Sequence, residues 1–425
     1  MTLAMRLFTT GEERAEIRPW TQLLAVALVG SALGWIAWGQ GRAPALAALL
    51  PLLLAACRTR GQAFVLGMAY TLLMERHNPA FIGSWFGNSL VIGWAAETVY
   101  VLVSGAVWSL GWSASGKPWR KALAVVVAWI VALLPPVSLG VAGHPVIAWG
   151  TILPGSGWVG VGLSVLGPAT MVWLVARHRP SAKSLAAVLA LLGAALCTIG
   201  FARFESPSRA TPAAVGVTTE WGQNVSVDGI LQRVASMGEV TRTLATQEAP
   251  TTVVWPESII GTYNPALYPV LNIEVLSVAR ASGQTHIIGM DLVGDGNRYE
   301  NAAVAFYPDG RTARAVARQP APVSLWKPWR KTDTFVADWS ANNVLTIGAT
   351  RRAAFIFCYE EYMPFFYLLN ELQGPVDLYV AMANTWAAES PEAAEIQTQH
   401  SFGMARLFGR PYIKAENRPL PSSKN

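Results

Sequence analysis

The chain has 425 residues, of which 52% are hydrophobic and only 14% are charged. Soluble domains usually carry about 25% charged residues, so this composition excludes an ordinary soluble protein and indicates surface that faces lipid. The net charge of +6 comes with no zinc-finger spacing, no phosphate-binding Gly-rich loop and no basic tract. We therefore expect no metal, no cofactor and no direct binding of nucleic acid.

Residues 1–202 consist mostly of long apolar runs and are predicted to form a membrane domain of about seven transmembrane helices. A helix needs about 20 residues to cross the hydrocarbon, so the second and third runs are the least certain spans. The fourth run contains Glu97, which is functional by default in lipid, although a helix end or a water-filled cavity would also accommodate it. The runs lie near residues 21–39, 43–57, 62–75, 87–112, 122–141, 157–176 and 184–202.

Lysine and arginine in the short connections predict the orientation, because these residues collect on the cytoplasmic side. If all seven runs span, only Arg42 and Arg76 fall on the side opposite the N-terminus. This bias places the N-terminus in the cytoplasm of an inner-membrane protein and the residues after Arg203 in the periplasm. The first run is expected to be an anchor, because it follows a charged segment and lacks a small-residue cleavage site. The eleven basic residues on the N-terminal side are Arg6, Arg14, Arg18, Arg58, Arg60, Lys117, Arg120, Lys121, Arg177, Arg179 and Lys183.

Residues 203–425 have the mixed composition of a globular domain and begin with a Ser- and Pro-rich linker at 206–212. Strand-like and helix-like stretches alternate after it, which predicts a sheet covered by helices. The expected strands are 213–219, 251–255, 286–290, 302–307, 353–357 and 376–382, and the expected helices are 228–246, 363–372 and 392–408.

Cys358 is the single cysteine of this second domain, so it has no partner there for a disulfide. An odd cysteine in an exported domain indicates a reactive thiol. It lies between an expected strand and an expected helix, where helix N-terminal amides lower the pKa of a thiol. A small buried hydrophobic residue at a strand end is the alternative interpretation.

Glu257 ends another apolar stretch, Thr-Thr-Val-Val-Trp-Pro-Glu at 251–257. A thiol nucleophile needs a base that takes its proton and later returns it, and a carboxylate at the edge of a neighbouring strand suits that role. A helix cap or a surface glutamate is the alternative. An oxyanion also needs a cation, and the candidates are in the basic segment 318–331, which is otherwise an ordinary loop.

These residues together resemble the nitrilase (carbon-nitrogen hydrolase) superfamily with its Glu–Lys–Cys triad. Glu follows Trp-Pro, basic residues lie sixty to seventy positions later, and Cys-Tyr-Glu at 358–360 follows an apolar strand. The membrane half with this domain is similar to the apolipoprotein N-acyltransferases. Ala-Asn-Thr-Trp at 383–386, the Gln-His…Ala-Arg helix at 399–406 and Gly-Arg-Pro at 409–411 extend the resemblance.

The resemblance implies a multi-spanning α-helical membrane domain, 1–202, followed by an extracytoplasmic nitrilase-type α-β-β-α sandwich, 203–425. Glu257 and Cys358 are then expected at the same sheet edge. Within the family, the chain resembles acyltransferase homologues recruited to plasmid conjugal transfer operons, which makes the conjugation machinery an expected partner.

Two departures from the family pattern concern its lysine and its C-terminus. Arg318 occupies the aligned lysine position, and the family's supporting glutamate falls near Trp326 or Lys327. Because Arg and Lys are not interchangeable at a tight site, Lys327 is the expected catalytic cation, with Arg318 as a supporting or replacement group. Alternatively, the triad chemistry is weakened or lost. The family also continues with more sheet and a last span, whereas this sequence stops at Asn425.

Three functions follow from these expectations. In the first, Cys358 accepts an acyl group from a phospholipid as a thioester, Glu257 acts as base and acid, and an amine such as that of a lipoprotein is the acceptor. In the second, the chain is a non-enzymatic membrane factor that supports conjugation. Hydrolysis of a small amide or nitrile is the third, and it is less expected because soluble nitrilases need no membrane spans.

Overall fold

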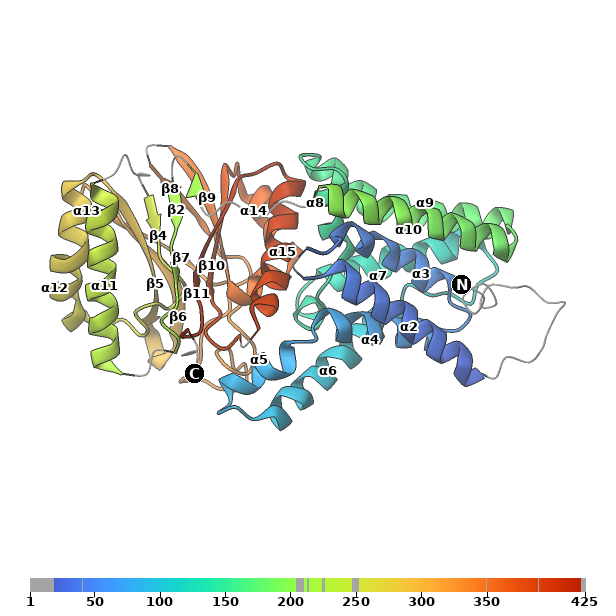
Figure 1. The fold of residues 1–425 in the computed structure, drawn as a ribbon, viewed down its shortest axis with the longest axis horizontal. Helices are drawn as coiled ribbons and strands as arrows, with labels where there is room; N and C mark the ends of the chain where they lie inside the picture. The colour runs from blue at the N-terminus through green and yellow to red at the C-terminus, as the bar shows by residue number, and fades with distance from the viewer. Residues whose placement is uncertain are drawn as a thin grey trace. The chain divides into compact units, whose positions relative to one another are not determined.

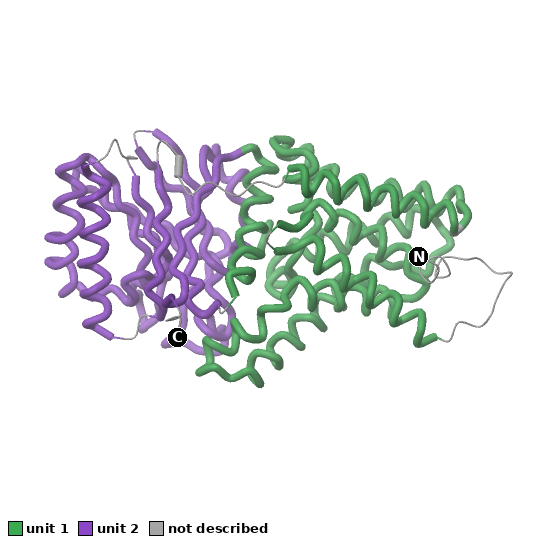
Figure 2. Tube along the Cα trace, viewed as in Figure 1, with its two compact units in different colours: residues 1–205, 362–365, 390–409 green, residues 206–361, 366–389, 410–425 purple. Residues whose placement is uncertain are grey.

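The computed structural model of the protein describes residues 19–39, 41–203, 210–211, 214–223, 226–246, 252–348, 350–388 and 390–421. The chain forms two compact units, drawn in green and purple in Figure 2. Unit 1 comprises residues 1–205, 362–365 and 390–409, and unit 2 comprises residues 206–361, 366–389 and 410–425.

The described part of unit 1 consists of helices and their connections. Four helices, α2, α6, α9 and α10, are long and apolar enough to cross a membrane, which makes the chain a membrane protein. The runs expected near 43–57, 62–75 and 122–141 form shorter helices, so the number of seven spans stays a prediction. The helices are α2 (Pro19–Ala37), a 3-10 helix (Pro44–Leu49), α3 (Leu50–Ala56), α4 (Arg60–Met74), α5 (Asn78–Trp85), α6 (Leu90–Ser109), α7 (Pro118–Leu133), 3-10 helices Val137–Gly140 and Pro145–Ala148, α8 (Trp149–Ile152), α9 (Gly157–His178) and α10 (Ala182–Ala202).

Close packing of α2 on α4 depends on two glycines spaced four apart, Gly30 and Gly34. A Cβ atom at either position would overlap a backbone oxygen of α4, that of Leu66 or of Tyr70. Small residues at this spacing let membrane helices approach closely, because lipid offers no hydrophobic drive for their association. At the end of the contact, Trp38 Nε1 donates to Tyr70 Oη at 2.9 Å.

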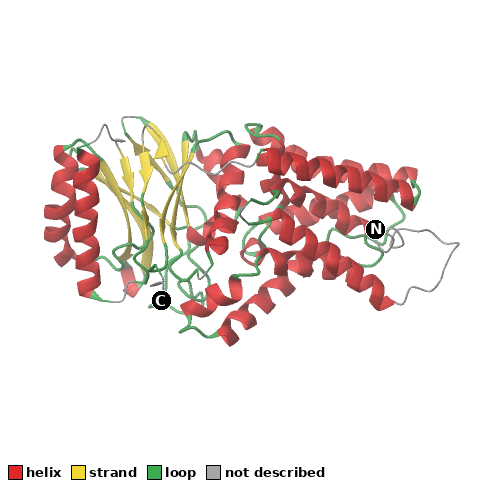
Figure 3. Ribbon diagram, in the orientation of Figure 1, coloured by secondary structure: helices red, strands yellow, loops and turns green. Residues whose placement is uncertain are grey.

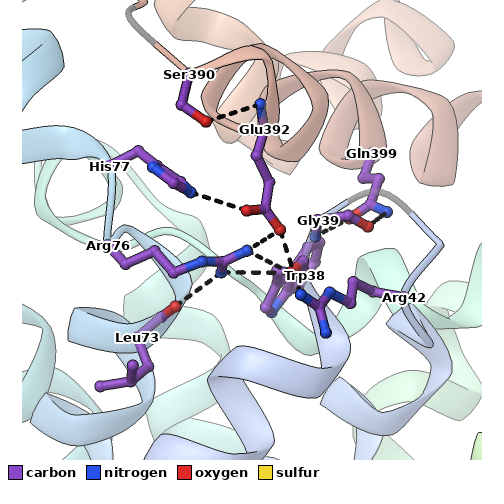
Figure 4. Close-up of polar contacts among 9 residues, drawn as sticks. All are labelled: Trp38, Gly39, Arg42, Leu73, Arg76, His77, Ser390, Glu392 and Gln399. Atoms are coloured by element: carbon purple, nitrogen blue, oxygen red, sulfur yellow. Dashed lines mark hydrogen bonds and ion pairs between the residues drawn. The ribbon is translucent and has the colours of Figure 1, made fainter.

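The helix expected at 392–408 is α15 (Pro391–Leu407), and it belongs to unit 1. Its Glu392 carboxylate pairs with Arg76, with His77 Nε2 at 3.0 Å and with Arg42 at 3.6 Å (Figure 4). Gln399, two turns further on, accepts from the Gly39 N–H at 2.9 Å and donates to the carbonyl of the same residue. These bonds join α15 to the ends of α2 and α4.

His400, the other half of the Gln-His motif, is fully buried in unit 1. Its Nε2 accepts from the Gly143 N–H at 2.9 Å, and its Nδ1–H donates to the Ile396 carbonyl at 2.7 Å. The ring stacks on Trp38 with centroids 4.2 Å apart. The motif quoted for the family resemblance thus attaches α15 to the membrane helices, although the predicted boundary at residue 203 placed this helix in the second domain.

Unit 2 contains two sheets. The first has the order β1-β2-β4-β5-β6-β7, parallel from β2 to β5 and antiparallel from β5 to β7. The second has the order β3-β11-β10-β9-β8, parallel except for its edge strand β8. The strands are β1 (Ala210–Thr211), β2 (Ala214–Gly216), β3 (Thr218–Thr219), β4 (Thr252–Val254), β5 (Thr285–Val293), β6 (Tyr299–Phe306), β7 (Thr312–Val316), β8 (Val344–Ile347), β9 (Arg351–Phe357), β10 (Leu378–Asn384) and β11 (Tyr412–Asn417).

The two sheets pack face to face, as the ribbon in Figure 3 shows, and one apolar core lies between them. Phe355, Phe357 and Met382 of the second sheet meet Val254 and Ile287 of the first, all of them buried. Successive strand residues point to opposite faces, so the residues between these core positions face the outer side of each sheet.

Helices cover both outer faces of the sandwich (Figure 1). A second core, which includes Val234, Met237 and Val275, lies between the first sheet and the helices α11 (Val227–Ala245), α12 (Tyr268–Leu271) and α13 (Ser277–Ala281), with a π-helical turn at Asn272–Leu276. On the second sheet, Tyr367 of α14 (Pro364–Gln373) packs on Tyr379 with ring centroids 5.1 Å apart. The predicted α-β-β-α sandwich is confirmed.

Candidate active site

Cys358 follows β9 directly and begins a 3-10 turn, Cys358–Tyr362, that leads into α14. The prediction of a strand-to-helix turn is confirmed. The backbone of Cys358 has φ +30°, a left-handed conformation that is strained for a residue with a side chain. Glu360 braces the turn, because its carboxylate accepts from the N–H of Phe357 at 3.1 Å and from that of Gln319 at 2.9 Å.

Glu257 leaves the end of β4 after Trp-Pro and is 5% exposed. Its Oε1 accepts from the Asn301 side-chain amide, and its Oε2 accepts from the Asn384 backbone N–H at 3.1 Å. Gly289 makes this placement possible, because a Cβ atom there would overlap the carbonyl oxygen of Pro256. The carboxylate is therefore fixed from β6 and from the end of β10.

The structure brings Glu257 and Cys358 together, since the thiol donates a hydrogen bond to the carboxylate. The Asn384 N–H is hydrogen-bonded to both groups. Burial raises the pKa of Glu257 to about 8, against the opposing effect of its hydrogen bonds from Asn301 and Cys358. The two residues thus share one site, but the expectation of a single sheet edge is wrong, because β4 belongs to the first sheet and β9 to the second.

The thiol itself has a pKa well above its ordinary value. Burial is the largest cause, and the negative charges of Glu257 and Glu361 add to it, while the Asn384 N–H opposes them. Both shifts disfavour the charged forms of the pair. Acid–base chemistry at this pair therefore needs a positive charge or a substrate that favours the thiolate.

Arg318 makes its contacts elsewhere in unit 2, although it is fully buried. Its Nε donates to the Ala341 carbonyl at 2.8 Å, and one terminal nitrogen donates to Asn370 Oδ1 and Gln373 Oε1, each at 2.8 Å. The guanidinium is therefore bonded to α14 and to the loop before β8. Its link to the site is indirect, through the Glu360 carboxylate, whose charge lies close enough to act on it.

Lys327 lies half-buried in the loop between β7 and β8. Its backbone N–H donates to Thr334 Oγ1 at 2.8 Å. Across the described ranges of the chain, the ammonium has no hydrogen bond or ion pair with Glu257 or Cys358. The role of Lys327 as catalytic cation stays a prediction.

Four groups around the site were not singled out as site residues from the sequence. Glu360 and Asn384 lie inside motifs that carried the family resemblance, so the motifs contained the signal. Asn301 and Lys414 had no such signal, because the carboxylates that they contact, those of Glu257 and Glu361, are distant from them in sequence. Among the residues that the structure describes, no three His, Cys, Asp or Glu side chains form a cluster that could hold a metal ion.

No family model matches the chain. Among curated proteins it is similar to conjugal transfer protein TraB of Agrobacterium fabrum, with 28% identity over 93% of this chain and 92% of that protein. A probable conjugal transfer protein TraB of Sinorhizobium fredii is also 28% identical, over 95% of this chain and 99% of its own length.

Solved structures with likeness to part of the chain are carbon-nitrogen hydrolases. An amidase from Nesterenkonia sp. has 15% identity and a TM-score of 0.30, over 40% of this chain and 63% of the amidase, which is less than two thirds of its length. A carbon-nitrogen hydrolase from Helicobacter pylori has 15% identity and a TM-score of 0.35, over 47% of this chain and 72% of its own. The similarity to the two conjugal transfer proteins, in contrast, extends over nearly the full length of this chain and of both relatives.

Proposed function

We propose that this chain is a membrane-bound, nitrilase-type acyltransferase that acts in plasmid conjugal transfer. The observation that carries the proposal is the hydrogen-bonded pair of Cys358 and Glu257, buried at the end of two strands with the cysteine in a strained turn. A strained turn holds a nucleophile in one orientation, and an adjacent carboxylate provides the base that a thiol requires.

In the proposed reaction, the sulfur of Cys358 attacks the ester carbonyl of a phospholipid while Glu257 takes the thiol proton. The ester C–O bond breaks, and Glu257 returns the proton to the leaving oxygen, which releases a lysophospholipid. An amine, such as that of a lipoprotein, then attacks the thioester; its proton passes through Glu257 to the sulfur, and the thiol is restored. Both halves use the same carboxyl group, first as base and then as acid.

The test is thioester trapping on purified protein in phospholipid micelles. We expect wild type to gain one acyl group, located by mass spectrometry on the peptide that contains Cys358, and Cys358→Ala to gain none. Cys197→Ala, in α10 of unit 1, is the matched control and should acylate like wild type. A wild-type protein that is folded but never acylated would rule out the enzyme.

The second candidate is a non-catalytic membrane factor for conjugation. It is favoured by the position of Arg318, whose guanidinium is bonded to α14 rather than to the thiol. This candidate predicts that Cys358→Ala supports plasmid transfer as well as wild type does. An acyltransferase required for transfer predicts a loss of transfer in the same variant.

A further inference from the structure

A buried ion-pair network lies beside the nucleophile turn. Lys414 of β11 is 5% exposed, and its ammonium is 3.3 Å from Glu361 Oε1 and 3.7 Å from Glu416 Oε1. Glu361 is fully buried and also accepts from the Tyr412 hydroxyl at 3.2 Å. Burying an ammonium costs free energy unless opposite charges compensate it. The Lys414 ammonium therefore depends on the carboxylates of Glu361 and Glu416.

Both ends of the network are attached to the Cys358–Glu257 pair. Glu361 belongs to the same 3-10 turn as Cys358, and its charge acts on the thiol. At the other end, Glu416 accepts from the Thr385 hydroxyl at 3.1 Å, and Thr385 follows the residue whose N–H bonds Glu257. The strand register supports this, because Glu416 of β11 pairs with Ala383 near the end of β10.

The network matters because it sets the balance of charge around the turn that contains Cys358. Three carboxylates, those of Glu257, Glu360 and Glu361, lie at or beside Cys358. Arg318 offsets Glu360 from a distance, whereas Lys414 forms a direct ion pair with Glu361. In the described part of the chain, Lys414 is the lysine that pairs with a carboxylate of this turn.

We infer that Lys414 is a positioning residue that supplies the positive charge supporting the nucleophile, by neutralising Glu361 in the turn that holds Cys358. The inference deepens the proposed function and rests on it for its purpose. The charge coupling itself exists whether or not the protein transfers acyl groups. The Lys414 charge thereby takes over part of the electrostatic role of the family's lysine, whose aligned position is Arg318 in this chain.

The experiment measures the rate at which iodoacetamide alkylates Cys358 as a function of pH, resolved by mass spectrometry on the full-length protein in detergent. Lys414→Met leaves the Glu361 charge uncompensated, so we expect the midpoint to move up by about one pH unit and the rate at neutral pH to fall about tenfold. Glu361→Gln removes a negative charge and should move the midpoint down. Lys414→Arg should stay near wild type.

The double variant Lys414→Met/Glu361→Gln separates electrostatics from structure. It removes both charges and leaves Glu416 paired with Arg418 at 2.8 Å, so we expect its midpoint to return close to that of wild type. Lys331→Met, an exposed lysine, is the control and should not shift. If Lys414→Met and Glu361→Gln move the midpoint in the same direction, or neither moves it, the inference is wrong. Failure of acyl transfer in wild type would instead overturn the proposed function and leave this result standing.

Discussion

At the scale of single residues, the two cations of the basic segment have different surroundings. Arg318 is buried, and its donors are occupied by the Ala341 carbonyl and by Asn370 and Gln373 of α14. Removing the guanidinium leaves the buried Asn370 Oδ1 without this donor, at a cost of about 1–3 kcal/mol, and also removes the bonds to the two part-buried acceptors. Lys327 is half-buried in a loop, so a bound substrate could reach its ammonium without loss of a structural contact.

These surroundings predict different outcomes for two alanine variants. Lys327→Ala should fold with an unchanged melting temperature and acylate Cys358 about 100- to 1000-fold more slowly, the usual loss for one oxyanion contact. Arg318→Ala should unfold at a lower temperature, so any loss of acylation follows from instability. Single-turnover acylation and thermal melts measure the two effects separately.

Lys331→Ala is the matched control, because it changes an exposed lysine of the same loop and should alter neither quantity. Normal acylation in Lys327→Ala together with a folded but inactive Arg318→Ala would make the aligned arginine the catalytic cation.

At the scale of elements, α15 depends on polar contacts for its attachment to the membrane helices. The side chain of Arg76 is 9% exposed and pairs with Glu392, so its charge has little access to water. Removing one partner of a largely buried pair leaves the other charge uncompensated. The Glu392 side chain is 26% exposed, so water screens this ion pair in part. Breaking the pair therefore destabilises the protein less than breaking a fully buried pair.

We therefore predict that Glu392→Gln destabilises unit 1 by about 1–2 kcal/mol, between the values for exposed and buried ion pairs. Thermal unfolding in detergent should show a melting temperature lower by a few degrees, at roughly 2–4 °C for each kcal/mol. Glu239→Gln, on the exposed face of α11, has the same chemistry without an ion pair and should melt like wild type. Equal melting temperatures for both variants would show that the cluster contributes no stability.

At the scale of the whole molecule, the number of spans decides on which side unit 2 lies. Seven spans place it opposite the N-terminus, whereas four spans, those of the four long apolar helices alone, would place it on the same side. The charge bias favours seven, with eleven basic residues on one side against Arg42 and Arg76 on the other. In the structure, Arg42 and Arg76 have another role, because both form ion pairs with Glu392 of α15.

We predict that alkaline phosphatase fused after residue 210 is active in bacterial cells, because this enzyme folds only outside the cytoplasm, where its disulfides form. A reporter that is active only in the cytoplasm should be silent at the same position. The opposite pair of results would establish an even number of spans and place the Cys358 site in the cytoplasm.

The sequence by itself determined the features that depend on local pattern. Apolar runs predicted the helices of unit 1, and apolar stretches that end in polar side chains predicted β4 and β9 with Glu257 and Cys358 at their ends. That the two residues share one site did not follow from strand endings, because β4 and β9 lie in different sheets and only the face-to-face packing of these sheets brings their ends together. The cofactor and partner expectations, which concern molecules outside the chain, stay predictions.

Only the tertiary structure decided the features that depend on contacts between distant segments. The strand β11 was not among the predicted strands, and the alternation of Lys414 and Glu416 with apolar residues is typical of a strand with one face in solvent. In the folded chain both side chains are buried, Lys414 against Glu361 and Glu416 against Thr385. Likewise, α15 reads as one more helix of the second domain, and its attachment to unit 1 rests on bonds from residues about 315 to 360 positions away. Periodicity along the chain tells which face of an element is apolar, but a buried charge is stable only where a partner meets it, and the fold alone brings that partner.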